Sequence, residues 1–191
     1  MKDRKFILGI AGYIASGKTE AGRYLEKLGA GFIEADEVVN TLYRQGGDGY
    51  RKIASYFGRD FLRKNGEINR KKLAKFVFSD VRKLKILNGL IHPLVHGEIR
   101  RIISKKREKV VAVEAAYFDK GGLLGVVDRI IWIECGRDLL KKRAMRGGVS
   151  AEMYEKIIGC QRRPEKVDFV VDNGGRKAAM FRQLKAIFDG L

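Results

Sequence analysis

The segment Gly12-Tyr13-Ile14-Ala15-Ser16-Gly17-Lys18-Thr19 fits the pattern G-x-x-x-x-G-K-[ST]. The apolar run Phe6–Ala11 before it predicts a buried strand, and a helix is expected to begin at about Lys18. Glycines let such a loop bend so that its N–H groups point at phosphate oxygens. The lysine adds a cation near the β- and γ-phosphates, and the threonine hydroxyl can hold Mg²⁺. The segment predicts a nucleotide-phosphate site, and the alternative is a glycine-rich turn without a ligand.

Short apolar runs alternate with helical patterns along most of the remaining chain. Further strands are expected at Gly31–Glu34, Val110–Val113, Arg129–Glu134 and Asp168–Val171. Helices are expected at Thr19–Leu28, Asp138–Arg146, Ala151–Arg162 and Lys177–Phe188. This order predicts an α/β fold, a doubly wound parallel sheet flanked by helices, with residues 1–191 as one domain.

Between the second and third expected strands, residues 37–107 are helical in pattern. Breaks are expected at Gly46-Gly47, Asn65-Gly66 and Pro93, and Asn69 is a plausible N-cap. Ligands of this fold class bind beyond the carboxyl ends of the strands. The insertion is therefore well placed to cover a second substrate.

The formal charge of +17 over 191 residues suits polyanions, either nucleic acid or a small molecule such as ATP. No zinc finger or aromatic RNA-binding motif accompanies that charge, which disfavours nucleic acid as the main partner. The spacing of Cys135 and Cys160 indicates neither a metal site nor a redox pair, and predicts a reducing compartment. No apolar segment reaches the roughly 20 residues of a membrane span.

The first residues are basic and then apolar, as in a secretory signal, but this run continues directly into the phosphate-loop segment. Cleavage there would destroy the motif. We therefore expect a mature, cytoplasmic protein, and the sequence leaves its oligomeric state open.

Candidate catalytic residues follow the strands. Asp36 can accept the proton of an attacking hydroxyl, or it can simply cap a helix over Glu37–Tyr43. Arg143 and Arg146 are three residues apart, so they can reach a γ-phosphate together or form an ordinary solvated helix face.

Weaker candidates remain at other strand and helix ends. The turn that contains Asn173 can frame an adenine or be only a tight turn. Glu114 and Asp119 can face a metal or the acceptor, and His92 beside Pro93 is more often structural than catalytic.

Taken together, blocks along nearly the whole chain resemble those of the dephospho-coenzyme A kinase family, and they occur in the family's order. The blocks are Gly9–Thr19, Phe32–Val39, Asn65–Arg70 with Leu73, Ile91-His92-Pro93, Arg143–Gln161 and Asp168–Gly174. The resemblance implies transfer of the ATP γ-phosphate to the ribose 3′-hydroxyl of dephospho-coenzyme A (dephospho-CoA), the last step of coenzyme A synthesis, with Mg²⁺.

The resemblance also implies roles for individual residues. Ala15 to Glu20 would wrap the ATP phosphates, Asp36 would be the catalytic aspartate, and Arg143 would be a lid arginine that closes over ATP. With Arg146 three residues on, we expect the two arginines to close together from a lid at 137–163. The insertion 37–107 would bind the coenzyme.

Two departures from the family pattern concern the acceptor side. Tyr13 and Ala15 replace two loop glycines, both at variable positions of the general pattern, so phosphate binding is expected to survive. The family's Pro-Leu-Leu-Phe-Glu segment stands here as residues 115–119, Ala-Ala-Tyr-Phe-Asp. A P-loop kinase that acts on another small acceptor, such as a nucleoside or nucleotide, is therefore the close alternative.

Two other classes of protein are more distant alternatives for the function. Residues 119–122, Asp-Lys-Gly-Gly, fit the D-x-x-G of GTP-dependent switches, but no Asn-Lys-x-Asp follows to select guanine. A basic nucleic-acid-binding protein that uses ATP only as a regulator would show salt-sensitive binding without turnover of a small molecule.

Overall fold

The computed structural model describes residues 4–118 and 122–191, which form two compact units. The first comprises residues 1–34 and 102–191, and the second comprises residues 35–101.

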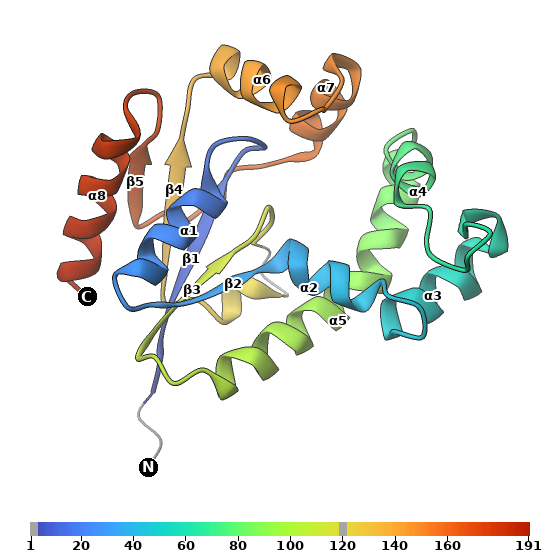
Figure 1. The fold of residues 1–191 in the computed structure, drawn as a ribbon, viewed down its shortest axis with the longest axis horizontal. Helices are drawn as coiled ribbons and strands as arrows, with labels where there is room; N and C mark the ends of the chain where they lie inside the picture. The colour runs from blue at the N-terminus through green and yellow to red at the C-terminus, as the bar shows by residue number, and fades with distance from the viewer. Residues whose placement is uncertain (1–3, 119–121) are drawn as a thin grey trace. The chain divides into compact units, whose positions relative to one another are not determined.

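The first unit is built on a five-stranded parallel sheet of order β2-β3-β1-β4-β5 (Figure 1). Its strands are β1 (Phe6–Gly12), β2 (Gly31–Glu34), β3 (Val110–Glu114), β4 (Arg129–Glu134) and β5 (Phe169–Asp172). Its helices are α1 (Lys18–Lys27), η2 (Leu123–Gly125), α6 (Arg137–Arg146), α7 (Ala151–Cys160) and α8 (Lys177–Asp189). The predicted doubly wound parallel α/β fold is confirmed.

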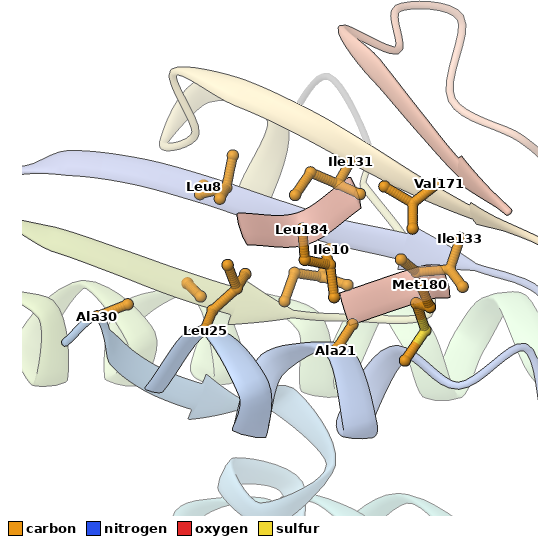
Figure 2. Close-up of a cluster of buried hydrophobic side chains, with 11 residues drawn as sticks. Leu8, Ile10, Ala21, Leu25, Ala30, Ile131, Ile133, Val171, Met180 and Leu184 are labelled. Atoms are coloured by element: carbon orange, nitrogen blue, oxygen red, sulfur yellow. The ribbon is translucent and has the colours of Figure 1, made fainter. Parts of the chain in front are cut away.

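The core of this unit lies between one face of the sheet and the helices α1 and α8 (Figure 2). Leu8 and Ile10 of β1 and Ile131 and Ile133 of β4 point to that face because side chains two residues apart share a face. They pack with Leu25 and other apolar residues of the two helices. This burial fixes the strand register and hence the loops at the strand ends.

The register also aligns the carboxyl ends of the strands. Glu34 of β2 and Ile10 of β1 both pair with Glu114 of β3, and Glu134 of β4 pairs with Asp172 of β5. Residues just beyond these ends therefore share one edge of the sheet, where the loop after β1 also begins.

The second unit is helical. It contains α2 (Ala35–Leu42), α3 (Asp48–Phe57), η1 (Arg59–Phe61), α4 (Arg70–Val77) and most of α5 (Val81–Lys105). The breaks at Gly46-Gly47 and Asn65-Gly66 are confirmed, and Asn69 caps α4 because its side chain accepts the Lys72 N–H at 3.1 Å. The expected break at Pro93 is wrong, because α5 runs through it. Burial of Ile91, Val95 and Ile99 along one stripe stabilises the helix despite the missing hydrogen bond.

No helix among residues 4–118 and 122–191 combines the length and the apolar character that crossing a bilayer requires.

Candidate active site

The candidate site of the first unit is built around the loop between β1 and α1, at the carboxyl edge of the sheet. The loop passes directly into α1, whose N-cap is Gly17. Glu114 ends β3, Asn173 follows β5, and α6 and α7 follow β4 at the same end (Figure 1). The sheet therefore gathers residues that are far apart in the sequence around one helix N-terminus, which favours an anion.

Close contacts inside the loop explain its two glycines. A Cβ on Gly12 would run into the Ser16 hydroxyl and lie 2.9 Å from the Ile133 carbonyl oxygen. Gly17 has a φ of 100°, and a Cβ there would collide with the Asn173 side-chain amide. Ala15 adopts a φ of 61°, a left-handed conformation that is unfavourable for a residue with a Cβ. The loop thus keeps a glycine-like shape at a position that holds alanine.

Two side chains inside the loop have the chemistry of a phosphate site. The buried Lys18 ammonium donates to the Tyr13 carbonyl oxygen at 3.1 Å. The Ser16 hydroxyl is fully buried and has no hydrogen-bond partner among residues 4–118 and 122–191. A buried hydroxyl without a partner costs free energy, and a ligand oxygen would remove that cost. The donor set of the loop therefore fits nucleotide phosphates.

Thr19 and Glu114 form an oxygen pair beside the loop. The Thr19 hydroxyl donates to Glu114 Oε2 at 2.9 Å, and Glu114 is only 7% exposed. Across the described ranges no three His, Cys, Asp or Glu side chains form a group that could hold a metal. One hydroxyl and one carboxylate suit Mg²⁺, which binds through few protein oxygens together with phosphates and water. Glu20, one residue on, forms an ion pair with Lys177 of α8.

Asn173 supports the loop from the end of β5. Its amide Nδ2 donates to the Ser16 carbonyl oxygen at 2.7 Å, and its own N–H donates to the Glu134 carbonyl oxygen at 2.8 Å. The side chain is 4% exposed, so the geometry makes it a brace of the loop. Its contact with a nucleotide stays a prediction.

The predicted lid residues lie on α6 and α7, which share a small apolar cluster. That cluster contains Cys135, Leu140, Ala144, Tyr154 and Ile158, and the partly buried Tyr13, Ile14 and Ala15 of the loop pack against it. The loop and the helix pair α6–α7 are therefore in direct contact.

The two arginines predicted to act in a lid lie in different surroundings. Arg143 Nη1 lies 3.6 Å from Cys135 Sγ, whereas Arg146 is exposed. Burial raises the pKa of the Cys135 thiol, the Arg143 guanidinium opposes that shift, and Asp172 adds to it. The cysteine is therefore a neutral neighbour of Arg143.

Sequence reasoning missed two contacts of the loop. Gln161 Oε1 accepts the Ile14 N–H at 2.8 Å, although the two residues are 147 positions apart. Tyr13 meets Trp132 edge to face at 5.0 Å between ring centroids, and the Arg163 guanidinium lies 5.5 Å from the Trp132 ring centroid. The only signal for Gln161 was its place at the end of the family-like block Arg143–Gln161.

Asp36 belongs to the second unit, two residues beyond the end of β2. It is the second residue of α2, so the alternative that it caps a helix starting at Glu37 is wrong: the helix begins at Ala35. Within residues 35–101, no hydrogen bond or ion pair holds its carboxylate. In the same unit, the His92 ring lies 5.6 Å from that of His96. Asp119 lies outside the described residues.

Comparison with known proteins adds a family to this geometry. The model of the dephospho-CoA kinase family matches residues 6–178. A dephospho-CoA kinase of Aquifex aeolicus is 30% identical over 189 residues, covering 96% of each chain. That of Geobacillus kaustophilus is 32% identical over 188 residues and 94% of each chain.

Solved structures agree in fold. The TT1252 protein of Thermus thermophilus matches with a TM-score of 0.82 at 24% identity, covering 99% of each chain. A dephospho-CoA kinase from Campylobacter jejuni matches with a TM-score of 0.65 at 24% identity, over 96% of this chain and 95% of that one. With the family model covering most of the sequence, the chain belongs to the dephospho-CoA kinase family.

Proposed function

We propose that the loop between β1 and α1 binds the phosphates of ATP and that the chain phosphorylates the ribose 3′-hydroxyl of dephospho-CoA. As its family membership indicates, the chain is a kinase, and its reaction is the final step of coenzyme A synthesis. The observation that carries the assignment is the loop itself. A buried lysine, a buried hydroxyl with no hydrogen-bond partner among the described residues, and a helix N-terminus converge there, and phosphate oxygens complement all three.

In this proposal Lys18 neutralises charge on the β- and γ-phosphates. The bond between the γ-phosphorus and the bridging oxygen of ADP breaks as the 3′-oxygen bonds to phosphorus. Negative charge builds up on the leaving oxygen in the transition state. An ammonium that the protein already holds in place stabilises this charge without having to move. Burial of Lys18 and its hydrogen bond to Tyr13 support that role.

Asp36 is proposed to orient the 3′-hydroxyl and accept its proton. A carboxylate with no partner in its own unit is available for a substrate hydroxyl. The chain reaches it two residues after β2, whose end is aligned with Glu114 in the sheet. This order along the chain supports the assignment.

Thr19 and Glu114 would hold Mg²⁺, which would neutralise phosphate charge when bound. Arg143 and Arg146 are proposed to close on ATP from a lid at residues 137–163, with Asn173 at the adenine side. The family resemblance supports the role of Arg143, the spacing of Arg146 supports its acting with Arg143, and contact between the loop and the cluster on α6 and α7 is consistent with a lid there.

The helical segment 37–107 is proposed to bind the acceptor. Its helix α4 carries Arg70, Lys71, Lys72 and Lys75 and has no acidic residue. Such a cationic helix suits a substrate with a pyrophosphate. We also propose a cytoplasmic location, and the two cysteines of the chain, Cys135 and Cys160, which are both free, support it.

The test is ATP consumption by purified protein with Mg²⁺, comparing dephospho-CoA, adenosine, AMP and no acceptor. Turnover with dephospho-CoA alone is expected. Turnover only with adenosine or AMP would contradict the acceptor and keep the kinase. Omission of Mg²⁺ and restoration with it tests the metal separately, and full turnover in a chelator would contradict the role of Thr19 and Glu114.

A further inference from the structure

The peptide unit between Tyr13 and Ile14 is engaged on both sides. Its carbonyl oxygen accepts the Lys18 ammonium and the Ser16 N–H, each at 3.1 Å. Its N–H donates to Gln161 Oε1 at 2.8 Å. A peptide is planar, so the N–H and the carbonyl turn together. The partner of the N–H therefore helps to fix the direction of the oxygen that holds Lys18, together with the Ser16 N–H.

Gln161 is itself held in place at the end of α7. As the C-cap of that helix, its N–H donates to the carbonyl oxygens of Ile157 and Ile158 at 3.1 and 3.3 Å. The next residue, Arg162, donates to the Gly159 carbonyl oxygen at 2.7 Å. The following residue, Arg163, lies over Trp132 of β4. Both flanks of the glutamine are thus anchored within the first unit.

Apolar packing alone does not fix the orientation of the Tyr13–Ile14 peptide. Tyr13, Ile14 and Ala15 touch the α6–α7 cluster, but such contacts are non-directional. Ala15 itself adopts a left-handed conformation that an unrestrained alanine avoids. Directional hydrogen bonds favour the observed orientation of the Tyr13–Ile14 peptide over its flipped form: on the carbonyl side from the Ser16 N–H, and on the N–H side to Gln161. Of these two partners, only Gln161 comes from outside the loop.

We propose that Gln161 is a positioning residue for Lys18. It fixes the Tyr13–Ile14 peptide, whose oxygen holds the ammonium where the nucleotide phosphates bind. This inference rests on the proposed function of the loop and deepens it. It also makes α7 part of the nucleotide site, since the helix delivers the acceptor oxygen that the loop needs.

The test compares Gln161→Met, which keeps the length of the side chain and removes the acceptor, with Gln161→Glu, which keeps an acceptor oxygen. Amide hydrogen exchange of Ile14 is measured by NMR in the nucleotide-free proteins. The methionine variant is expected to exchange roughly 10-fold faster at Ile14, and the glutamate variant to stay near the parent. ATP affinity and kcat are expected to fall about 10-fold in Gln161→Met, with KM for dephospho-CoA unchanged.

Gln183→Met is the matched control. Gln183 also accepts a main-chain N–H, that of Asp172 at 3.1 Å, but it lies on α8, and its side-chain hydrogen bonds among the described residues go to Asp172 and Ala179. It is expected to leave Ile14 exchange and ATP affinity unchanged. If Gln161→Met does not fold, Gln161→Asn, which shortens the side chain, carries the same expectations.

Unchanged Ile14 exchange or unchanged ATP affinity in Gln161→Met would overturn the inference. Neither measurement needs an acceptor. A parent protein that binds ATP but is inactive with dephospho-CoA would therefore contradict the proposed acceptor alone, and the two failures are distinguishable.

Discussion

Lys18 and Asp36, the groups assigned to the two substrates, are held in different ways. Lys18 is buried, bonded to Tyr13, and sits in a loop braced by Asn173 and Gln161. Asp36 lies in the first turn of α2, and nothing within residues 35–101 holds its carboxylate. The phosphate loop is therefore preorganised by the protein, whereas no contact within residues 35–101 fixes the Asp36 carboxylate. A charge that is already in position needs no reorganisation during phosphoryl transfer. We therefore expect substitutions of Lys18 and of Asp36 to change ATP affinity and kcat in different ways.

The largest effect is expected for Lys18→Ala. Loss of the buried ammonium removes charge stabilisation in both the bound nucleotide and the transition state. We expect kcat/KM to fall by about 10³-fold and ATP affinity to fall with it. Steady-state kinetics and calorimetric titration with ATP check both. Lys27→Ala, at an exposed position near the end of the same helix, is the control and should leave both values unchanged.

Asp36→Asn should separate the two sides. We expect kcat to fall by roughly 10²-fold or more, because the amide cannot accept the hydroxyl proton. ATP affinity should stay nearly intact, since Asp36 is proposed to act on the hydroxyl of the acceptor and not on the nucleotide. The exposed neighbour Glu37 offers the matched control Glu37→Gln. Normal turnover in Asp36→Asn would remove this residue from the mechanism.

Asn173→Ala tests the brace of the loop. It leaves the Ser16 carbonyl oxygen without a donor in a buried place. The free energy of unfolding is expected to fall by about 1–2 kcal/mol, and ATP affinity by about 10-fold. Urea denaturation and ATP titration measure the two quantities. A stability loss with unchanged ATP affinity would show that the brace serves folding only.

The smallest effect is expected for Ala15→Gly. Glycine accepts a φ of 61° without strain, so the free energy of unfolding should rise by about 0.5–1 kcal/mol. The comparison is Ala186→Gly at an exposed helical position of α8, where the sign should reverse. A destabilising Ala15→Gly would mean that the alanine methyl contributes more by packing than its conformation costs.

Sequence patterns were sufficient for features that depend on neighbours along the chain. The alternation of strands and helices, the loop of Gly12 to Thr19 and the Asn69 cap all follow from local rules. Local rules failed at Pro93, where burial along α5 outweighs the helix-breaking preference. They also could not find Gln161 or the bracing role of Asn173, because those hydrogen bonds join residues 147 and 157 positions apart. Only the folded sheet brings these partners together.

The contact between Tyr13 and Trp132 has an optical consequence. Trp132 is the single tryptophan of the chain, is 2% exposed, and lies edge to face with a residue of the phosphate loop. Its fluorescence therefore comes from one known place, next to the loop that nucleotides are proposed to occupy. A movement of Tyr13 or of the Arg163 guanidinium would change the emission of that indole. The protein thus carries an intrinsic reporter, by which loop rearrangement can be followed in real time without a label.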